Sequence, residues 1–171
     1  MMHRKTLVLL SLVVAFGIVL TGCATMGHLQ TPSGRPEVFI EGVTIKDATN
    51  ACVSMLSANA WQIEQASDYM VQAVHTSDNA MVDFMWGSSY SYHQTFYRLI
   101  FTFSQEANGV RVYGTQQVVG NKGTGFENVM ALTNQKAYEG TQNYLEGIRN
   151  RALQGVMSYN TCKSNLEKIM V

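Results

Sequence analysis

The chain has 171 residues, and only 14% of them are charged, with 12 basic and 12 acidic side chains. Ser, Thr, Asn and Gln together number 48, and 46% of the residues are hydrophobic, which excludes a disordered chain. The zero net charge argues against a nucleic-acid-binding protein, and the length suits one domain rather than a multidomain enzyme.

The first 22 residues have the pattern of an export signal. Arg4 and Lys5 provide a basic start, and an apolar run of about 15 residues extends from Thr6 to Leu20. This run is short for a membrane-spanning helix, which needs about 20 apolar residues. We therefore predict that residues 1–22 are a signal peptide.

The signal ends in Leu20-Thr21-Gly22-Cys23, which resembles the lipobox of bacterial lipoproteins. The resemblance implies cleavage before Cys23 and attachment of lipid to its sulfur, so that the protein contacts the membrane through its N-terminus. Ala24 follows the cysteine, whereas in enteric bacteria an Asp at that position resembles an inner-membrane retention signal. We expect a cell-envelope location, at the outer membrane facing the periplasm if the organism is diderm.

The mature chain begins with a short tether and carries little net charge. Residues 23–36 are predicted to form this lipidated tether, because Gly and Pro recur there and large apolar side chains are few. Fully extended, the tether would reach about 45 Å. The mature chain keeps 10 basic and 12 acidic residues, a net charge of −2, so nothing indicates binding to an anionic polymer such as a nucleic acid.

A strand and a helix open the predicted domain. Residues 37–41 are an apolar run after Pro36, which favours a strand. Thr44 and Asp47 have the spacing of a capping box at a helix N-terminus. Apolar residues then recur at helical spacing, so we expect an amphipathic helix over residues 45–58.

Four strands are expected next. The sequence predicts two of them at 61–65 and 69–75, and a run rich in β-branched and aromatic residues predicts a third at 95–104. Asn108-Gly109 is the residue pair that a tight hairpin favours. Residues 110–119 are therefore expected to return beside 95–104 as the fourth strand.

A loop at 120–125 leads to a second amphipathic helix. Apolar residues trace one helical face from 134 to 153, and Gly155 is expected to end the helix. Residues 154–171 then form a tail that can add a short helix. The order β-α-β-β-β-β-α over residues 37–153 predicts an α+β domain, with an antiparallel sheet of four to five strands and two main helices packed on one face.

The domain adds to the resemblance that the lipobox carries. The hexapeptide Ser33-Gly34-Arg35-Pro36-Glu37-Val38 and the α+β layout after it resemble small uncharacterised envelope lipoproteins of bacteria. In that group a Trp opens the second strand, as Trp61 does here, although Ala60 stands where a Gly can precede it. The layout is also similar to the sheet-and-helix modules of outer-membrane assembly lipoproteins. The resemblance implies an envelope role and supplies no catalytic residues.

Two cysteines remain once Cys23 carries lipid. Cys52 lies on the first helix and Cys162 in the C-terminal tail, and an exported protein meets an oxidising compartment. A Cys52–Cys162 disulfide would close a loop of about 110 residues and stabilise the fold by about 4 kcal/mol. The alternative is two separate buried thiols, because spacing alone does not establish the geometry that a disulfide needs.

No pattern in the sequence predicts a catalytic centre. The G-x-S-x-G motif of serine hydrolases is absent, and Cys52 lies on an apolar helix face. His75 with Asp78 and Asp83 is the best acid–base set, and it equally fits polar residues at the mouth of a loop. We therefore expect no enzymatic activity and no cofactor.

Metal-binding patterns are equally weak. Met81 and Met85, with His75 and His93 on either side, offer soft ligands of the kind that copper prefers. Methionine is also a common packing residue, and the C-x-x-C and H-E-x-x-H patterns of zinc sites are absent from the sequence. We expect no metal site.

Residues 80–97 are unusually rich in aromatic side chains. Long loops without regular structure are uncommon and often functional, and Tyr and Trp are frequent at protein and membrane interfaces. One interpretation is a helix that covers the open face of the sheet; the others are a surface for a partner, or for a membrane or ligand. The candidate surface residues are Phe84, Trp86, Tyr90 and Tyr92.

Together these patterns predict a lipid-anchored envelope protein with a structural or protein-binding role and another envelope protein as its partner. The alternative is a protein that binds a lipid or a small apolar ligand in a pocket near residues 80–97. The two functions require different sites, since a partner needs an exposed apolar patch whereas a ligand needs an enclosed apolar pocket.

Overall fold

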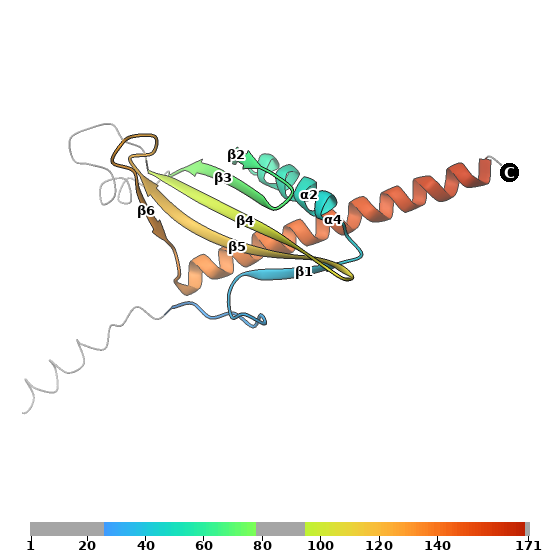
Figure 1. Cartoon of the computed structure of the whole chain (residues 1–171), viewed down its shortest axis with the longest axis horizontal. Coiled ribbons are helices and arrows are strands. Elements are labelled where there is room, and N and C mark those ends of the chain that lie inside the picture. Colours follow the sequence, from blue (N-terminus) through green and yellow to red (C-terminus); the bar gives the residue numbers. More distant parts are fainter. Residues whose placement is uncertain (1–25, 78–94, 170–171) are drawn as a thin grey trace, which may run out of the picture.

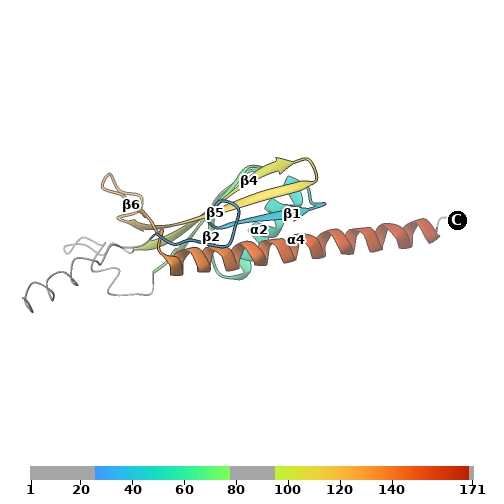
Figure 2. The ribbon, with the colours of Figure 1, turned by 90° about the horizontal axis from the view of Figure 1, so that it is seen from below.

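The computed structural model describes residues 26–77 and 95–169, and it describes the side chains of the last helix as far as Met157. Within these residues one antiparallel six-stranded sheet carries helices α2 and α4 on the same face, which confirms the predicted α+β class (Figures 1 and 2). The elements are β1 (Glu37–Glu41), α2 (Ile45–Ala58), β2 (Gln62–Ala66), β3 (Met70–Thr76), β4 (Phe96–Glu106), β5 (Gly109–Gly120), β6 (Asn128–Ala131) and α4 (Gln135–Ile169).

The sheet is built around the β4–β5 hairpin. The strand order is β1-β5-β4-β3-β2, and β5 pairs with β4 along its whole length, from Gly109 opposite Glu106 to Val119 opposite Phe96. The other edge of β5 is shared by two short strands, because β1 pairs with residues 109–113 and β6 with residues 117–120. β1 and β6 therefore lie end to end along one edge.

The core lies between the sheet and the two helices. Alternate strand residues face the helices, and the predicted apolar faces of both helices are buried against them. Thr44 caps α2 as predicted, since its Oγ1 accepts a hydrogen bond from the Asp47 amide at 3.2 Å. Fully buried core residues include Ile40, Cys52, Leu56, Val71, Phe101, Val110, Val112, Leu145 and Ile148.

Helix α4 packs tightly against the sheet at Gly114 in β5. A Cβ atom at this glycine would lie 2.5 Å from Thr141 Cγ2 and 3.2 Å from a ring carbon of Phe101. Thr141 is only 1% exposed, and its hydroxyl donates to the Ala137 carbonyl oxygen at 2.8 Å, so the side chain has its own partner within the helix. The glycine is therefore what lets the helix backbone rest on the strand.

The tether is folded against the domain over its described part. The Gly27 amide donates to the Thr133 carbonyl at 2.6 Å, and the His28 amide donates to Gln135 Oε1 at 2.9 Å. Further along, Gln142 of α4 bonds both the amide and the carbonyl of Glu37 at 3.1 Å. These bonds satisfy backbone groups at the open edge of β1 and hold the tether beside the start of α4.

Two elements differ from the prediction, the strand β6 and the C-terminal end of α4. β6 was not expected, because all of its residues are exposed and show no alternation of buried and exposed positions. Helix α4 does not end at Gly155 but continues to Ile169, so the C-terminal tail is not a separate unit. One glycine costs a helix only about 1 kcal/mol, which the residues around it can offset.

No helix within the described residues is long and apolar enough to cross a membrane.

In this structure Cys52 does not form the predicted Cys52–Cys162 disulfide. Cys52 is a free thiol with no exposed surface, and burial raises its pKa. Its side chain faces the core, whereas the helix that carries Cys162 runs past the sheet into the space beyond it (Figure 1). Of the two alternatives that the spacing left open, the structure has a separate buried thiol at Cys52.

A substitution at Gly114 tests the close contact between α4 and β5. We expect Gly114→Ala to lower the free energy of unfolding by about 1–3 kcal/mol, because the added methyl group meets Thr141 and Phe101. Gly140→Ala is the matched control, since its Cβ would meet nothing within 4 Å and the helix should gain up to about 1 kcal/mol. Equal effects in urea unfolding would contradict the predicted contact.

Alkylation tests the state of the cysteines. In the native protein Cys52 should stay unmodified by iodoacetamide, because it has no exposed surface and its thiolate is disfavoured. After unfolding without a reductant, both Cys52 and Cys162 should become alkylated, as read by peptide mass spectrometry. A disulfide-linked peptide pair in that sample would show that the sequence-based prediction holds in solution.

Candidate functional site

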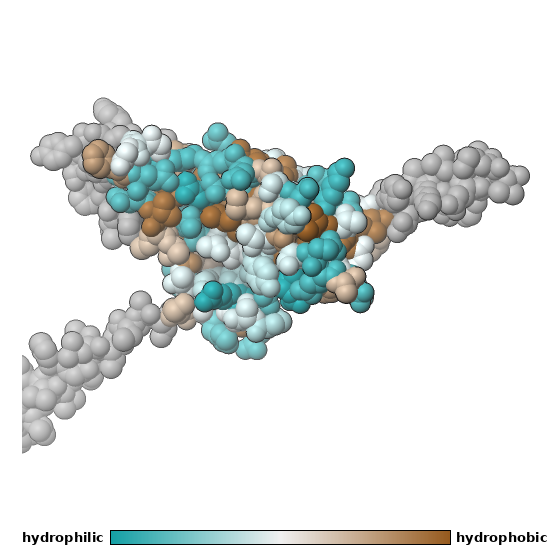
Figure 3. Space-filling view, in the orientation of Figure 1, coloured by the Kyte–Doolittle hydropathy of each residue, from teal (hydrophilic) through white to brown (hydrophobic). Residues whose placement is uncertain are grey.

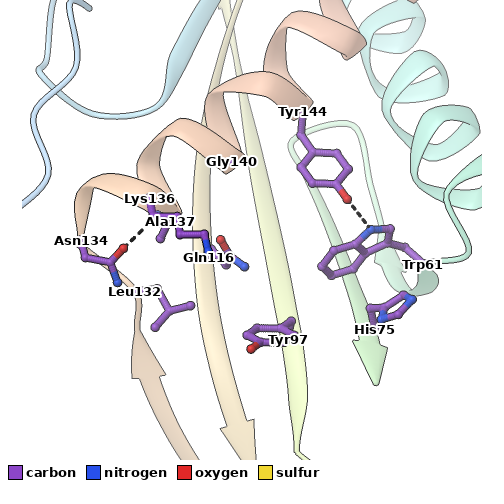
Figure 4. Close-up of a pocket in the computed structure, with 10 residues that line it drawn as sticks. All are labelled: Trp61, His75, Tyr97, Gln116, Leu132, Asn134, Lys136, Ala137, Gly140 and Tyr144. Atoms are coloured by element: carbon purple, nitrogen blue, oxygen red, sulfur yellow. Dashed lines mark hydrogen bonds between the residues drawn. The ribbon is translucent and has the colours of Figure 1, made fainter. Parts of the chain in front are cut away.

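A cleft of about 390 Å³ lies between the first turns of α4 and the inner face of the sheet (Figure 4). Side chains reach it from the residue before β2, from β3, β4 and β5, from the segment after β6 and from α4. It is lined by Trp61, His75, Tyr97, Gln116, Leu132, Asn134, Lys136, Ala137, Gly140 and Tyr144. Four of these residues carry rings, so one wall of the cleft is aromatic.

Trp61 is placed by the turn that ends α2. Asn59 caps the helix, Ala60 takes a positive φ of 59°, and the Trp61 amide donates to the Leu56 carbonyl at 3.0 Å. The chain therefore reverses directly into β2. The indole Nε1 donates to the Tyr144 hydroxyl oxygen at 3.0 Å, and the two rings meet edge to face with centroids 5.8 Å apart.

His75 and Tyr97 lie opposite each other on β3 and β4, on the side of the sheet that faces the cleft. The His75 ring centroid is 5.5 Å from that of Trp61. His75 Nδ1 is 2.8 Å from the Thr76 carbonyl oxygen, which can only accept, so Nδ1 carries a proton. In a neutral ring Nε2 is then left as an acceptor for another molecule.

The first turns of α4 and the residues before them line the rest of the cleft with both polar and apolar residues. Asn134 caps α4, since its Oδ1 accepts from the Ala137 amide at 3.0 Å. Gly140 faces open space, because a Cβ atom there would have no neighbour within 4 Å. Lys136 is the one permanently charged side chain among the described lining residues. The cleft thus pairs an aromatic wall with a few hydrogen-bonding groups.

This set of side chains is suited to binding a ligand. Among the described lining residues none is Asp, Glu, Ser or Cys. Across the described part of the chain, no three His, Cys, Asp or Glu side chains gather in a way that would hold a metal ion. The arrangement can stack against an apolar face and donate or accept hydrogen bonds.

The predicted site residues are only partly tested by this geometry. Cys23 and the surface residues Phe84, Trp86, Tyr90 and Tyr92 lie outside the described residues, as do Asp78, Asp83, Met81, Met85 and His93. From the predicted 80–97 segment, Tyr97 does line the cleft, and His75 joins it. The sequence predicted Trp61 as the first residue of the second strand, which begins one residue later at Gln62, and it predicted a helix around Tyr144, but it did not bring the two residues together.

The outer face of the sheet carries a network of paired charges. Glu64 of β2 contacts both Lys122 and Arg98, and Arg98 Nη2 is 3.1 Å from Glu127 Oε1. The Lys122 ammonium also lies 4.8 Å from the centre of the Phe96 ring. The network joins β2, β4 and the β5–β6 loop.

The pKa values of the two carboxyl groups reflect this pairing. For Glu64, burial opposes ionisation, but hydrogen bonds from Lys122 and Gln72 and the charges of Lys122 and Arg98 outweigh it and lower the pKa. For Glu127, the hydrogen bond from the Gly123 amide is the main cause of a lowered pKa. Both groups are therefore ionised partners within the fold, which indicates a structural role for the network.

Acid titration of Glu64→Gln tests the network. At pH 7 the variant should be less stable than the unmodified protein by about 1 kcal/mol. Because the pKa of Glu64 is lowered from 4.5, its carboxylate stabilises the fold above that pH and loses this effect as the pH falls. The difference in unfolding free energy should therefore shrink below pH 4.5. Glu41→Gln, at an exposed position, is the control; a difference independent of pH would argue against the network.

Comparison with known proteins supplies no family assignment for this arrangement. No protein-family model matches the chain, and no curated protein matches it at a significant level. Any function of the chain therefore rests on its own residues and their geometry.

Proposed function

We propose that the chain is a bacterial lipoprotein, held at the cell envelope by lipid on Cys23, whose α+β domain binds a small molecule in the aromatic cleft. The lipobox-like Leu20-Thr21-Gly22-Cys23 supports the anchor. The cleft supports the binding role, and it is the single observation that carries it: about 390 Å³ lined by Trp61, Tyr97 and Tyr144 beside His75. Volumes of this size are typical of small-molecule sites.

The absence of a catalytic role is part of this proposal. The His75 imidazole bonds its neighbouring backbone carbonyl, and the Tyr144 hydroxyl accepts from Trp61. Both polar groups are thus engaged in positioning the aromatic wall. A binding domain needs such a pre-formed wall, because rigid side chains lose little conformational entropy when a ligand settles on them.

The lining also narrows the class of ligand. With Lys136 as the sole permanent charge among the described lining residues, the cleft favours a neutral or anionic ligand over a cationic one. The rings favour an apolar or planar face, and Gln116 and Asn134 offer amide groups for a polar end. An amphiphilic molecule with one apolar face and one polar group meets both conditions.

A protein partner in the envelope remains the second proposal. Its predicted surface, Phe84, Trp86, Tyr90 and Tyr92, lies outside the described residues, so the geometry offers no comparable argument for it. The cleft therefore gives the more direct test of function.

Gly140→Leu tests the cleft by filling it. The variant should fold normally, because the position is helical and the new side chain starts in open space. Protein purified from bacterial membranes would be examined by native mass spectrometry for small molecules that co-purify. We expect a bound species in the unmodified protein and a loss of roughly tenfold or more in Gly140→Leu, equivalent to about 1.4 kcal/mol of binding free energy.

Gly155→Leu is the matched control for that experiment. Gly155 lies in the same helix, also with nothing within 4 Å of a Cβ atom, but it does not line the cleft. It should retain the bound species. Equal occupancy in both variants, or no small molecule in the unmodified protein, would count against the proposed site.

A further inference from the structure

The point at which the tether joins the domain is well defined. Its first described residues are held by the hydrogen bonds from Gly27 to Thr133 and from His28 to Gln135. Thr133 lies between the end of β6 and the start of α4. In Figure 1 this junction is at one end of the molecule, and the C-terminal end of α4 is at the other.

The tether leaves little slack between this junction and the membrane. Cys23 precedes Gly27 by four residues, which span at most about 14 Å when extended. This step rests on the proposed lipid anchor at Cys23. The whole tether would have allowed about 45 Å, but its later residues are bound to the domain. The end of the domain near Thr133 must therefore stay close to the bilayer surface.

The same end exposes apolar side chains. Met26 is 64% exposed, Phe126 82%, Val129 48% and Met130 38%. They make up four of the seven large hydrophobic side chains that are exposed among the described residues. Phe126 lies just before β6 and Thr133 just after it, so the strand connects these side chains to the tether junction. Figure 3 shows a small apolar patch near β6, with hydrophilic surface beside it.

The charges at this end are mostly paired. Lys122 contacts Glu64, and Arg98 contacts Glu127, so the charged residues of the β5–β6 loop give this end of the domain no excess of positive or negative charge. A surface of this kind does not attract an anionic partner strongly. It suits a shallow interfacial contact, in which exposed apolar side chains enter the headgroup region of a bilayer.

We infer that the anchor end of the domain, defined by Met26, Phe126, Val129 and Met130, lies on the phospholipid surface and orients the domain there. The partner is the bilayer itself. The lipid on Cys23 supplies the affinity. Val129 and Met130 point to opposite faces of β6, so the exposed side chains fix which edge of the sheet points toward the membrane. Leu132 and Asn134, which flank Thr133, also line the cleft, so the cleft lies next to the membrane and within reach of membrane-borne ligands.

Lipid photo-crosslinking tests this orientation with the full mature chain. The lipidated protein would be reconstituted into vesicles of phosphatidylethanolamine and phosphatidylglycerol that contain a trace of phospholipid with a diazirine in its acyl chain. Crosslinked peptides would be quantified by mass spectrometry. We expect the peptide that contains Phe126 and Met130 to be labelled roughly fivefold or more above the peptide that contains Tyr69.

The variant Phe126→Ser, Val129→Ser, Met130→Ser should stay anchored and folded, because all three positions are exposed, and should lose most of that labelling. Tyr69→Ser is the control: Tyr69 is 69% exposed but precedes β3 at the end away from the tether junction, and its loss should change nothing.

The outcomes separate this inference from the lipid anchor. If Cys23 is acylated and the protein sediments with vesicles, but residues 126–130 are labelled no more than the Tyr69 peptide, the inferred orientation is wrong while the anchor stands. If Cys23 carries no lipid and the protein stays in the supernatant, the anchor is wrong, and the orientation falls with it. Thermal unfolding of each variant checks that it is folded.

Discussion

Helix α4 crosses β5 where Gly114 faces Thr141. This contact divides the space between the helix and the sheet into a packed core on one side and the cleft on the other. Beyond the crossing, Leu145, Ile148 and Ala152 are buried in the core against the sheet and α2. Before it, the helix and the inner face of the sheet enclose the cleft, in which Gly140 presents no side chain. A single missing Cβ atom on the strand thus sets the distance at which the helix packs, because close-packed interiors transmit small displacements.

The aromatic wall of the cleft depends on the packing of the same helix. Tyr144 can accept the hydrogen bond from Trp61 only because α4 lies over the sheet beside the end of α2. The contact also buries part of the indole against the core. Fold stability and the shape of the proposed binding site are therefore linked through one pair of side chains, and a ligand that rests on Trp61 would meet a surface that the fold has already ordered.

The edge of β5 links the domain to its proposed anchor. β1 covers the first half of this edge and β6 the second, and between them the Gly114 amide bonds the Pro36 carbonyl. The tether thereby enters the sheet directly and is held at Thr133 as well. A chain attached in this way has few orientations available near a bilayer, in contrast to one that hangs from a flexible linker.

The sequence by itself determined the elements whose residues are half buried. Periodic burial leaves a pattern in the chain, and the observed bounds of β1 and α2 coincide with those expected. The expected β4–β5 hairpin also forms, but its turn lies one residue earlier than predicted, because Gly109 already pairs with Glu106. The sequence of β6 has no alternation of apolar and polar residues, because all of its residues are exposed. The strand is formed by backbone pairing with β5 and not by burial of one face. The disulfide stays a prediction, because spacing does not distinguish one pair of cysteines from another, whereas the packing has Cys52 as a free thiol in the core. The cleft, too, was decided by tertiary structure, since it joins Trp61, Tyr97 and Tyr144 from distant segments whose local patterns say only strand or helix.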